Sequence, residues 1–259
     1  FAAAQLPAVV GNVMRKGPGL GGLGPTQADY FQITKGGGHG DYHPISLAPH
    51  NIQEVADLTG EAFELANRYR NPVIIALDGV LGQMMEPVEF KRQTDKVPQE
   101  QVMDWPADGC KNRTRRYIGS YCLAPEVGEK HCFVLEEKHQ LMSTNEQRWE
   151  TYRIDDAKYL IVAFGTAARI VKTAVDALRR EDIKVGLIRP ITLWPFPKKA
   201  FSGLDAIEGA MVVELSAGQM IEDVRLAMDC AVPVKFYGRQ GGMLPVPEDL
   251  VAAFRASLL

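Results

Sequence analysis

The sequence lacks the cysteine spacing of zinc-binding and iron–sulfur proteins. Its four cysteines are Cys110, Cys122, Cys132 and Cys230, and none of them forms a CxxC pair. A zinc ribbon or a ferredoxin-type cluster is therefore not encoded here. Four free thiols fit a reducing cytoplasm, so we expect a cytoplasmic protein. The first three lie in one segment, so an incidental disulfide between two of them remains an alternative.

Long apolar runs and a strong excess of one charge are also missing. No apolar run approaches the ~20 residues that a membrane helix needs. The net charge of −3 gives no electrostatic reason to expect nucleic acid or an anionic membrane as a partner. The start, FAAAQLPAVV, has no basic region, so we expect no signal peptide. Because it does not begin with Met, we expect the native start to lie upstream.

Phosphate-binding and nucleophile motifs are scarce. The chain contains neither GxxxxGK[ST] nor GxSxG. Gly17, Gly19 and Gly22 do form a GxGxxG, but no acidic residue stands at the required place after a second strand. The motif is therefore weak as a dinucleotide fingerprint. A nucleotide-binding α/β protein that uses this loop as a cradle remains an alternative.

The first 90 residues alternate strand and helix patterns. Three buried strands are predicted, at residues 6–14, 44–48 and 72–77. Asn51 and Glu54 form a capping box ahead of a helix, and a short helix is expected around residues 28–34. Short connections predict a parallel sheet with right-handed crossovers. The sheet begins at a mid-sheet strand, so we expect this unit to be incomplete at its N-terminus and to expose an apolar face.

The regular pattern breaks down between about residues 80 and 157. Prolines interrupt it, and the segment GCKNRTRRY carries four basic side chains in nine residues. We interpret this region as a linker with an insertion that packs over a neighbouring surface. Basic and aromatic residues mix here, which is typical either of contact with nucleotide-like groups or of a solvated turn. These residues are Trp105, Arg113, Arg115, Arg116 and Tyr117.

A complete βαβαβ unit follows. Its strands are predicted at residues 159–164, 185–188, 210–215 and 233–237. Thr166 is expected to cap the first helix, a second helix follows SAGQ, and Pro247 is expected to open the last helix, because proline is favoured at the first helical position.

Charged residues near the glycine loop are the candidates for chemistry. Arg15 follows the first strand, and in open parallel sheets ligands bind beyond the carboxyl ends of strands. An arginine there can clamp a carboxylate with two hydrogen bonds. Alternatively, Arg15 and Lys16 are solvated loop charges. His39 and Asp41 in GGGHGD either relay a proton or orient a ligand, or they only fix the turn. We predict no metal site.

Several segments together resemble a known family. The stretch LPAVVGNVMRKGPGLGGLGPTQADYFQITKGGGHGDYHPISLAP resembles the alpha subunits of 2-oxoacid:ferredoxin oxidoreductases, and EAFELANRYRNPVIIALDGVLGQ continues the likeness. The segments VVELSAGQMIEDVRLAM and YGRQGGMLP look like the C-terminal transketolase-like domain of that family. The resemblance spans nearly the whole chain apart from residues 92–135. It is greatest to the 2-oxoisovalerate type, with the 2-oxoglutarate type near.

The resemblance implies an α/β fold of two transketolase-like units with mainly parallel sheets. Residues 1–90 would be the C-terminal part of a thiamin pyrimidine-binding domain. Residues 91–157 would be the linker and insertion, and residues 158–259 the transketolase C-terminal-like domain.

The implied activity is the oxidative decarboxylation of a 2-oxoacid with coenzyme A, which yields acyl-CoA, carbon dioxide and reduced ferredoxin. Thiamin diphosphate and Mg²⁺ would be shared with a beta subunit. Iron–sulfur clusters would lie on beta and gamma/delta-type subunits of the hetero-oligomer. A non-catalytic assembly subunit of such a complex is the alternative.

The resemblance also implies roles for residues of this chain. Substrate binding would fall to Arg15, Lys16 and Gly17. The active-site loops would include Gly19, Thr26, Gln27, His39 and Asp41. No catalytic residue is assigned, because the activating glutamate of the family and its Tyr-Pro-Ile-Thr-Pro segment would lie upstream of Phe1.

Overall fold

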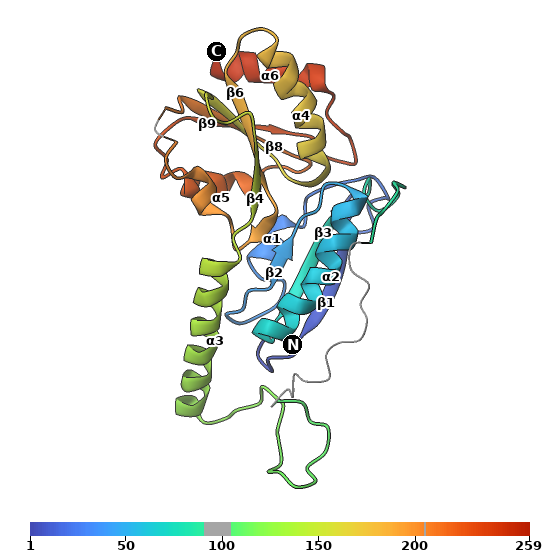
Figure 1. Ribbon diagram of the computed structural model, residues 1–259, viewed down its shortest axis with the longest axis vertical. Coiled ribbons are helices and arrows are strands. Elements are labelled where there is room, and N and C mark those ends of the chain that lie inside the picture. The colour runs from blue at the N-terminus through green and yellow to red at the C-terminus, as the bar shows by residue number, and fades with distance from the viewer. Residues whose placement is uncertain (91–104, 205) are drawn as a thin grey trace.

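Two sheets organise the molecule (Figure 1). The computed structural model describes residues 1–90, 105–204 and 206–259. One sheet has the strand order β1-β3-β2-β7, and the other has the order β4-β6-β5-β8-β9. Within those residues, no helix is both long enough and apolar enough to cross a membrane. Residues 91–104, which belong to the predicted linker, lie outside the described residues.

The first sheet is mostly parallel. Its strands are β1 (Ala8–Met14), β2 (Ile45–Leu47), β3 (Pro72–Asp78) and β7 (Thr192–Trp194). Strands β1 and β2 both run parallel to β3, whereas β7 pairs antiparallel with β2. Strand β7 comes from the C-terminal region, so the two regions of the chain share this sheet. The predicted domain boundaries remain predictions.

Helix α2 (Ile52–Tyr69) connects β2 to β3, and the short helix α1 (Tyr30–Thr34) precedes β2. The predicted cap of α2 is confirmed, because the Asn51 side chain accepts a hydrogen bond from the Glu54 nitrogen at 2.7 Å. The Glu54 carboxylate in turn accepts a hydrogen bond from the His50 backbone nitrogen at 3.1 Å. One face of α2 packs on the sheet through Leu58, Ala62, Leu65 and Ala66.

The second sheet is covered on both faces. Parallel strands β5 (Tyr159–Val162), β6 (Val185–Pro190), β8 (Gly209–Glu214) and β9 (Val234–Gly238) form it, with β4 (Trp149–Tyr152) antiparallel at one edge. Its helices are α4 (Gly165–Arg179), α5 (Met220–Ala227), α6 (Pro247–Leu258) and the 3₁₀ helix η1 (Lys198–Phe201).

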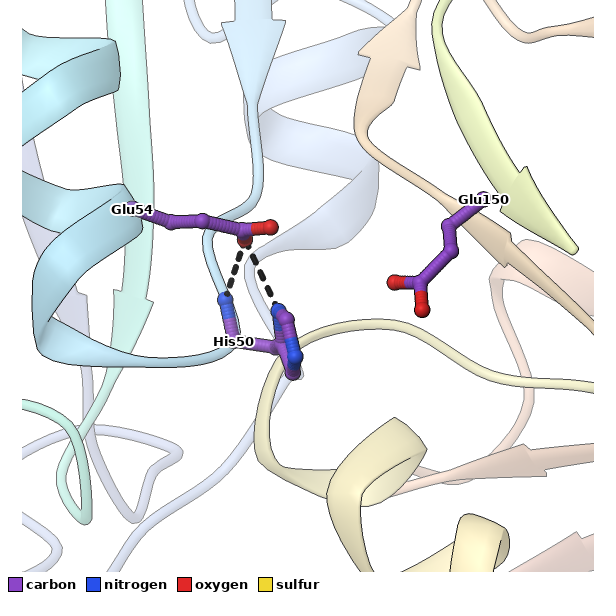
Figure 2. A group of neighbouring side chains, drawn as sticks. All are labelled: His50, Glu54 and Glu150. Atoms are coloured by element: carbon purple, nitrogen blue, oxygen red, sulfur yellow. Dashed lines mark hydrogen bonds and ion pairs between the residues drawn. The ribbon is translucent and has the colours of Figure 1, made fainter. Parts of the chain in front are cut away.

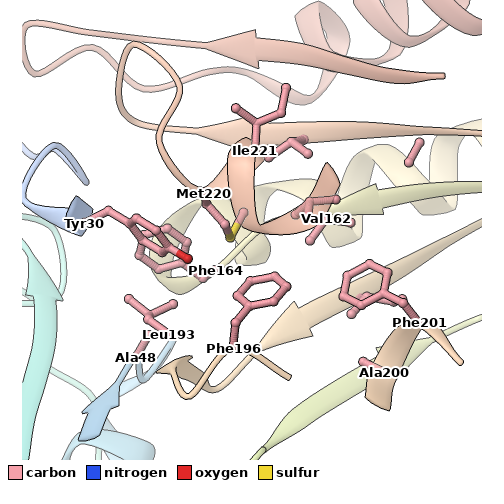
Figure 3. Close-up of a cluster of buried hydrophobic side chains, with 14 of the residues drawn as sticks. Tyr30, Ala48, Val162, Phe164, Leu193, Phe196, Ala200, Phe201, Met220 and Ile221 are labelled. Carbon is pink, nitrogen blue, oxygen red and sulfur yellow. The ribbon is translucent and has the colours of Figure 1, made fainter. Parts of the chain in front are cut away.

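Successive residues of β5 point to opposite faces, as strand geometry requires. Ile161 packs in one apolar cluster with residues of α4 and α6, whereas Leu160 packs in another with residues of α5. The α5 cluster extends to Tyr30 and Ala48 of the first unit, so the two units share one core (Figure 3). The predicted α/β fold with mainly parallel sheets is confirmed.

The prediction of an irregular linker is wrong for residues 125–145. They form helix α3 (Pro125–Asn145), which begins with proline in its first turn and contains no proline after it. Only Leu135, His139 and Met142 are buried, at helical spacing. Phe133 and other apolar residues of α3 point to solvent, so no single apolar stripe marks the helix.

Two short strands were not predicted, and one predicted helix cap is wrong. The short strands β4 and β7 fall in segments with too few residues to show a strand pattern. Thr166 does not cap α4, because the helix already begins at Gly165 with Phe164 at the capping position. By contrast, Pro247 opens α6 as expected.

Candidate functional site

Arg15 stands at the point where β1 ends and the glycine loop begins. Its backbone pairs with Pro25 in an antiparallel bridge, and the Lys16 nitrogen donates to the Gly24 carbonyl at 2.7 Å. Residues 15–25 therefore leave the sheet and return to it as one loop. The exposed Arg15 guanidinium donates to the Leu20 carbonyl at 2.5 Å. The same nitrogen also lies 3.4 Å from the Lys16 carbonyl, and these two neutral acceptors leave the other donors of the guanidinium available to a ligand.

A groove lies beside this loop, at the carboxyl ends of β1 and β3. Its volume is about 690 Å³. Three segments build it: the glycine loop, the turn after β3 and the loop after β9. In the part of the chain that the structure describes, no charged side chain lines it. The lining residues are Leu23, Gly24, Pro25, Gly79, Val80, Gln83, Met84, Gly242 and Leu244. Ligands of open parallel sheets bind at this edge, so the groove is the candidate site.

Two glycines bring the walls of the groove together. A Cβ on Gly24 would lie 2.7 Å from the Cα of Gly242, and a Cβ on Gly242 would lie 2.9 Å from the Cα of Gly24. Gly242 also has a φ of +86°, which other residues rarely adopt. The loop after β9 can approach the glycine loop this closely only because neither position carries a side chain.

Gln27 joins the glycine loop to the second sheet. Its side chain is completely buried. The amide nitrogen donates to the Phe164 carbonyl at 2.8 Å, and the amide oxygen accepts from the Leu215 nitrogen at 3.0 Å. Thr26 is also buried, and its hydroxyl donates to the Arg15 carbonyl at 3.0 Å. Thr26 and Gln27 therefore hold the loop in place through contacts within the chain.

Asp78 is a site residue that the sequence reasoning missed. It is buried at the end of β3, where it accepts hydrogen bonds from the nitrogen and hydroxyl of Thr166 at 3.2 and 2.9 Å. It also accepts from the Val80 nitrogen at 2.9 Å. The carboxylate thus orders the turn that lines the groove and ties it to α4. An aspartate followed by glycine at the end of a buried strand was the available signal.

The other predicted loop residues lie in two places. Gly17 and Gly19 are exposed on the glycine loop beside Arg15 and Lys16. His39 and Asp41 are exposed on the following loop and do not line the groove. Their roles toward a ligand remain predictions.

A cluster of carboxylates with a histidine lies between the two units (Figure 2). His50, Glu54 and Glu150 place ligand atoms within 4.8 Å of one another, the arrangement that a metal ion requires. However, Arg189 donates to Glu54 at 2.8 Å and to Glu150 at 2.7 Å, and Lys172 donates to Glu150 at 2.6 Å. These cations already neutralise both carboxylates, so the cluster is a structural salt bridge.

Comparison with known proteins places this architecture in a family. Residues 1–151 match the family described as "Pyruvate flavodoxin/ferredoxin oxidoreductase, thiamine diP-bdg". Residues 157–250 match "Pyruvate:ferredoxin oxidoreductase core domain II". The chain belongs to the 2-oxoacid:ferredoxin oxidoreductase family. The resemblance found in the sequence is thereby confirmed.

Relatives of this oxidoreductase subunit include the ketoisovalerate oxidoreductase subunit VorB of Methanothermobacter marburgensis. The two are 46% identical over 258 residues, which is 98% of this chain and 72% of the relative. The 2-oxoglutarate synthase subunit KorA of Methanocaldococcus jannaschii is 32% identical, over 96% of this chain and 73% of the relative.

A solved structure supports the fold. The 2-oxoglutarate:ferredoxin oxidoreductase of Magnetococcus marinus superposes with a TM-score of 0.77 at 21% identity. The match covers all of this chain and 50% of the other, so this oxidoreductase subunit corresponds to half of that chain.

A group of aromatic rings in this oxidoreductase subunit surrounds Trp194, and His139 is its buried member. The His43 ring stacks on the Trp194 ring, with centroids 4.7 Å apart, and the His139 ring meets His43 edge-on at 5.2 Å. Burial lowers the pKa of His139 to about 4. Burial also lowers the pKa of His43. His139 Nε2 and His43 Nδ1 have no hydrogen-bond partner among the described residues. The group docks α3 against the sheet as neutral, largely apolar rings.

Proposed function

We propose that this chain is a subunit of a thiamin-diphosphate-dependent oxidoreductase complex. The complex oxidatively decarboxylates a branched-chain 2-oxoacid, with coenzyme A as acyl acceptor and ferredoxin as electron acceptor. The observation that carries the proposal is Arg15, which presents an exposed guanidinium at the carboxyl end of β1 beside an apolar groove. A guanidinium binds a carboxylate with paired hydrogen bonds. The 46% identity to a ketoisovalerate oxidoreductase subunit supports the branched-chain substrate.

A partner subunit would complete the binding site for the cofactor. The family description for residues 1–151 names thiamin diphosphate, which stabilises a carbanion when it is bound. His50, Glu54 and Glu150 are the described residues that could hold a metal ion, but their carboxylates already pair with Arg189 and Lys172. We therefore assign the diphosphate and its Mg²⁺ to a beta subunit. The iron–sulfur clusters would lie on beta and gamma/delta-type subunits, as no cysteine spacing in this chain suits them.

Exposed apolar side chains support a subunit rather than a free protein. Val10 and Val13 of β1 are 49% and 48% exposed. Many more apolar side chains are exposed between residue 117 and the middle of α3, namely Tyr117, Tyr121, Leu123, Val127, Phe133 and Val134. Exposed apolar surface of this kind marks protein–protein contact. We propose that the beta subunit covers it.

The predicted division of the chain fits this role. We propose residues 1–90 as the part that contributes to the thiamin site and residues 158–259 as the transketolase C-terminal-like domain. Residues 91–157 would serve as the linker and insertion.

Replacing Arg15 in the reconstituted complex tests the proposal. We expect Arg15→Ala to raise the KM for 2-oxoisovalerate by about tenfold to a hundredfold, because a charge-assisted contact of roughly 1.5–3 kcal/mol is lost. Arg15→Lys should recover part of that loss, since a single ammonium keeps the charge without the paired geometry.

Lys198→Ala is the matched control, because Lys198 is an exposed cation on η1 that does not line the groove. Unchanged kinetics in Arg15→Ala would remove Arg15 from the site. A complex that assembles with this chain but turns over no 2-oxoacid would favour the assembly role instead.

A further inference from the structure

We propose that the apolar groove beside Arg15 receives the hydrocarbon side chain of the substrate and selects uncharged acyl chains over dicarboxylates. The inference rests on the proposed function and names the part of the site that decides which 2-oxoacid is used. The walls of the groove are formed by Leu23 and Pro25 from the glycine loop, Val80 and Met84 from the turn after β3, and Leu244 from the loop after β9.

The position of the groove next to Arg15 supports this assignment of the substrate side chain. Pro25 lines the groove and pairs with Arg15 in an antiparallel bridge. The two residues therefore lie side by side where the glycine loop leaves the sheet and returns to it. Paired residues in such a bridge have Cα atoms about 5 Å apart. A small 2-oxoacid can therefore place its carboxylate at Arg15 while its hydrocarbon enters the groove.

The composition of the lining decides between substrate classes. A 2-oxoacid with a branched hydrocarbon would bury only apolar atoms against Leu23, Val80 and Leu244. A dicarboxylate such as 2-oxoglutarate would bring a second negative charge into the same place. Among the described residues, Gln83 carries the only polar side chain of the lining, and no lysine or arginine belongs to it. Once the beta subunit covers this exposed face, a charge in the groove would be buried without a partner, which is unfavourable, so the dicarboxylate is rejected.

The walls are held in place before a ligand arrives. Asp78 binds the Val80 and Leu81 nitrogens and so orders the turn that carries Val80 and Met84. Gly24 and Gly242 set the distance between the other two walls. Selectivity by a pocket depends on walls that do not move to suit the wrong ligand.

The test uses the reconstituted complex and compares kcat/KM for 2-oxoisovalerate and 2-oxoglutarate. Leu23→Arg places a cation in the groove, and the Leu23 side chain is 79% exposed, so the change should not disturb folding. We expect the ratio of 2-oxoglutarate to 2-oxoisovalerate activity to rise at least tenfold. Leu244→Arg, on the wall formed by the loop after β9, should shift the ratio in the same direction.

Met85→Arg is the matched control, because Met85 is 94% exposed and lies next to a lining residue without lining the groove itself. It adds the same charge and should leave the ratio unchanged. A ratio that stays constant in both Leu23→Arg and Leu244→Arg, or that shifts equally in Met85→Arg, would overturn the assignment of the groove. The failure of the unaltered complex to use any 2-oxoacid would instead overturn the proposed function.

Discussion

Arg189 of β6 and Glu54 of α2 form a paired salt bridge across the two units, with nitrogen–oxygen distances of 3.1 and 2.8 Å. The Arg189 side chain is only 2% exposed and binds Glu150 of β4 as well. Burial alone would raise the pKa of Glu54, but the hydrogen bond from His50 and the charge of Arg189 outweigh it and lower the pKa to about 2.

We expect Arg189→Met to destabilise the protein by about 3–5 kcal/mol, because the partly buried Glu54 carboxylate loses its guanidinium partner and Glu150 keeps only Lys172. Unfolding in urea at pH 7 measures the loss. Adding Glu54→Gln to Arg189→Met should restore part of the lost stability by removing the charge of the Glu54 carboxylate. A single variant as stable as the unaltered chain would show that the salt bridge contributes nothing.

The same pair has a pH signature. The pKa of Glu54 in the folded chain lies below its ordinary value of 4.5. The stability that the ionised Glu54 contributes to the fold is therefore present above pH 4.5 and is lost as the pH falls toward 2.

The close approach of Gly24 and Gly242 gives a second stability prediction. Gly242→Ala adds a Cβ 2.9 Å from the Cα of Gly24 at a φ of +86°. We expect a loss of about 1–3 kcal/mol from the combined backbone strain and overlap. Thermal unfolding measures it. Gly11→Ala is the control, because no atom lies within 4 Å of the Cβ it would add. Equal melting temperatures for the two variants would contradict the packing described here.

The histidine group beside Trp194 predicts a loss of stability in mild acid. Burial lowers the pKa of His139 to about 4, whereas an unfolded histidine titrates near 6.5. The unfolded chain therefore binds a proton first, and stability falls as the pH drops from 6.5 toward 4. Between pH 7.5 and 5 the loss from His139 should be about 2 kcal/mol.

His139→Phe checks that assignment. A phenyl ring keeps the buried shape and cannot be protonated, so the free energy of unfolding should change less between pH 7.5 and 5 than in the unaltered chain. His131→Phe is the control, because His131 lies on the same helix, is only partly buried and stands outside the group around Trp194. An identical pH dependence in His139→Phe and the unaltered chain would exclude His139 as the group responsible.

Local signals in the sequence predicted the elements around the site well. The valine-rich run ending at Met14, the Asn51 cap and Pro247 each act over a few residues, so their outcome does not depend on distant contacts. Helix α3 was missed for the opposite reason. Its buried residues His139 and Met142 gain their burial from packing against residues of the first sheet and its connections, and nothing nearby in the chain distinguishes them from exposed Phe133.

The sequence by itself determined the family, the parallel α/β architecture and the place of Arg15 at the end of a strand, because motifs and hydrophobic periodicity are properties of neighbouring residues. Only the tertiary structure decided that Gln27 is buried between the sheets, that Asp78 binds Thr166 and that the two glycines touch. These contacts join residues 88 or more positions apart along the chain. Their formation depends on how the sheets pack, which no short segment encodes.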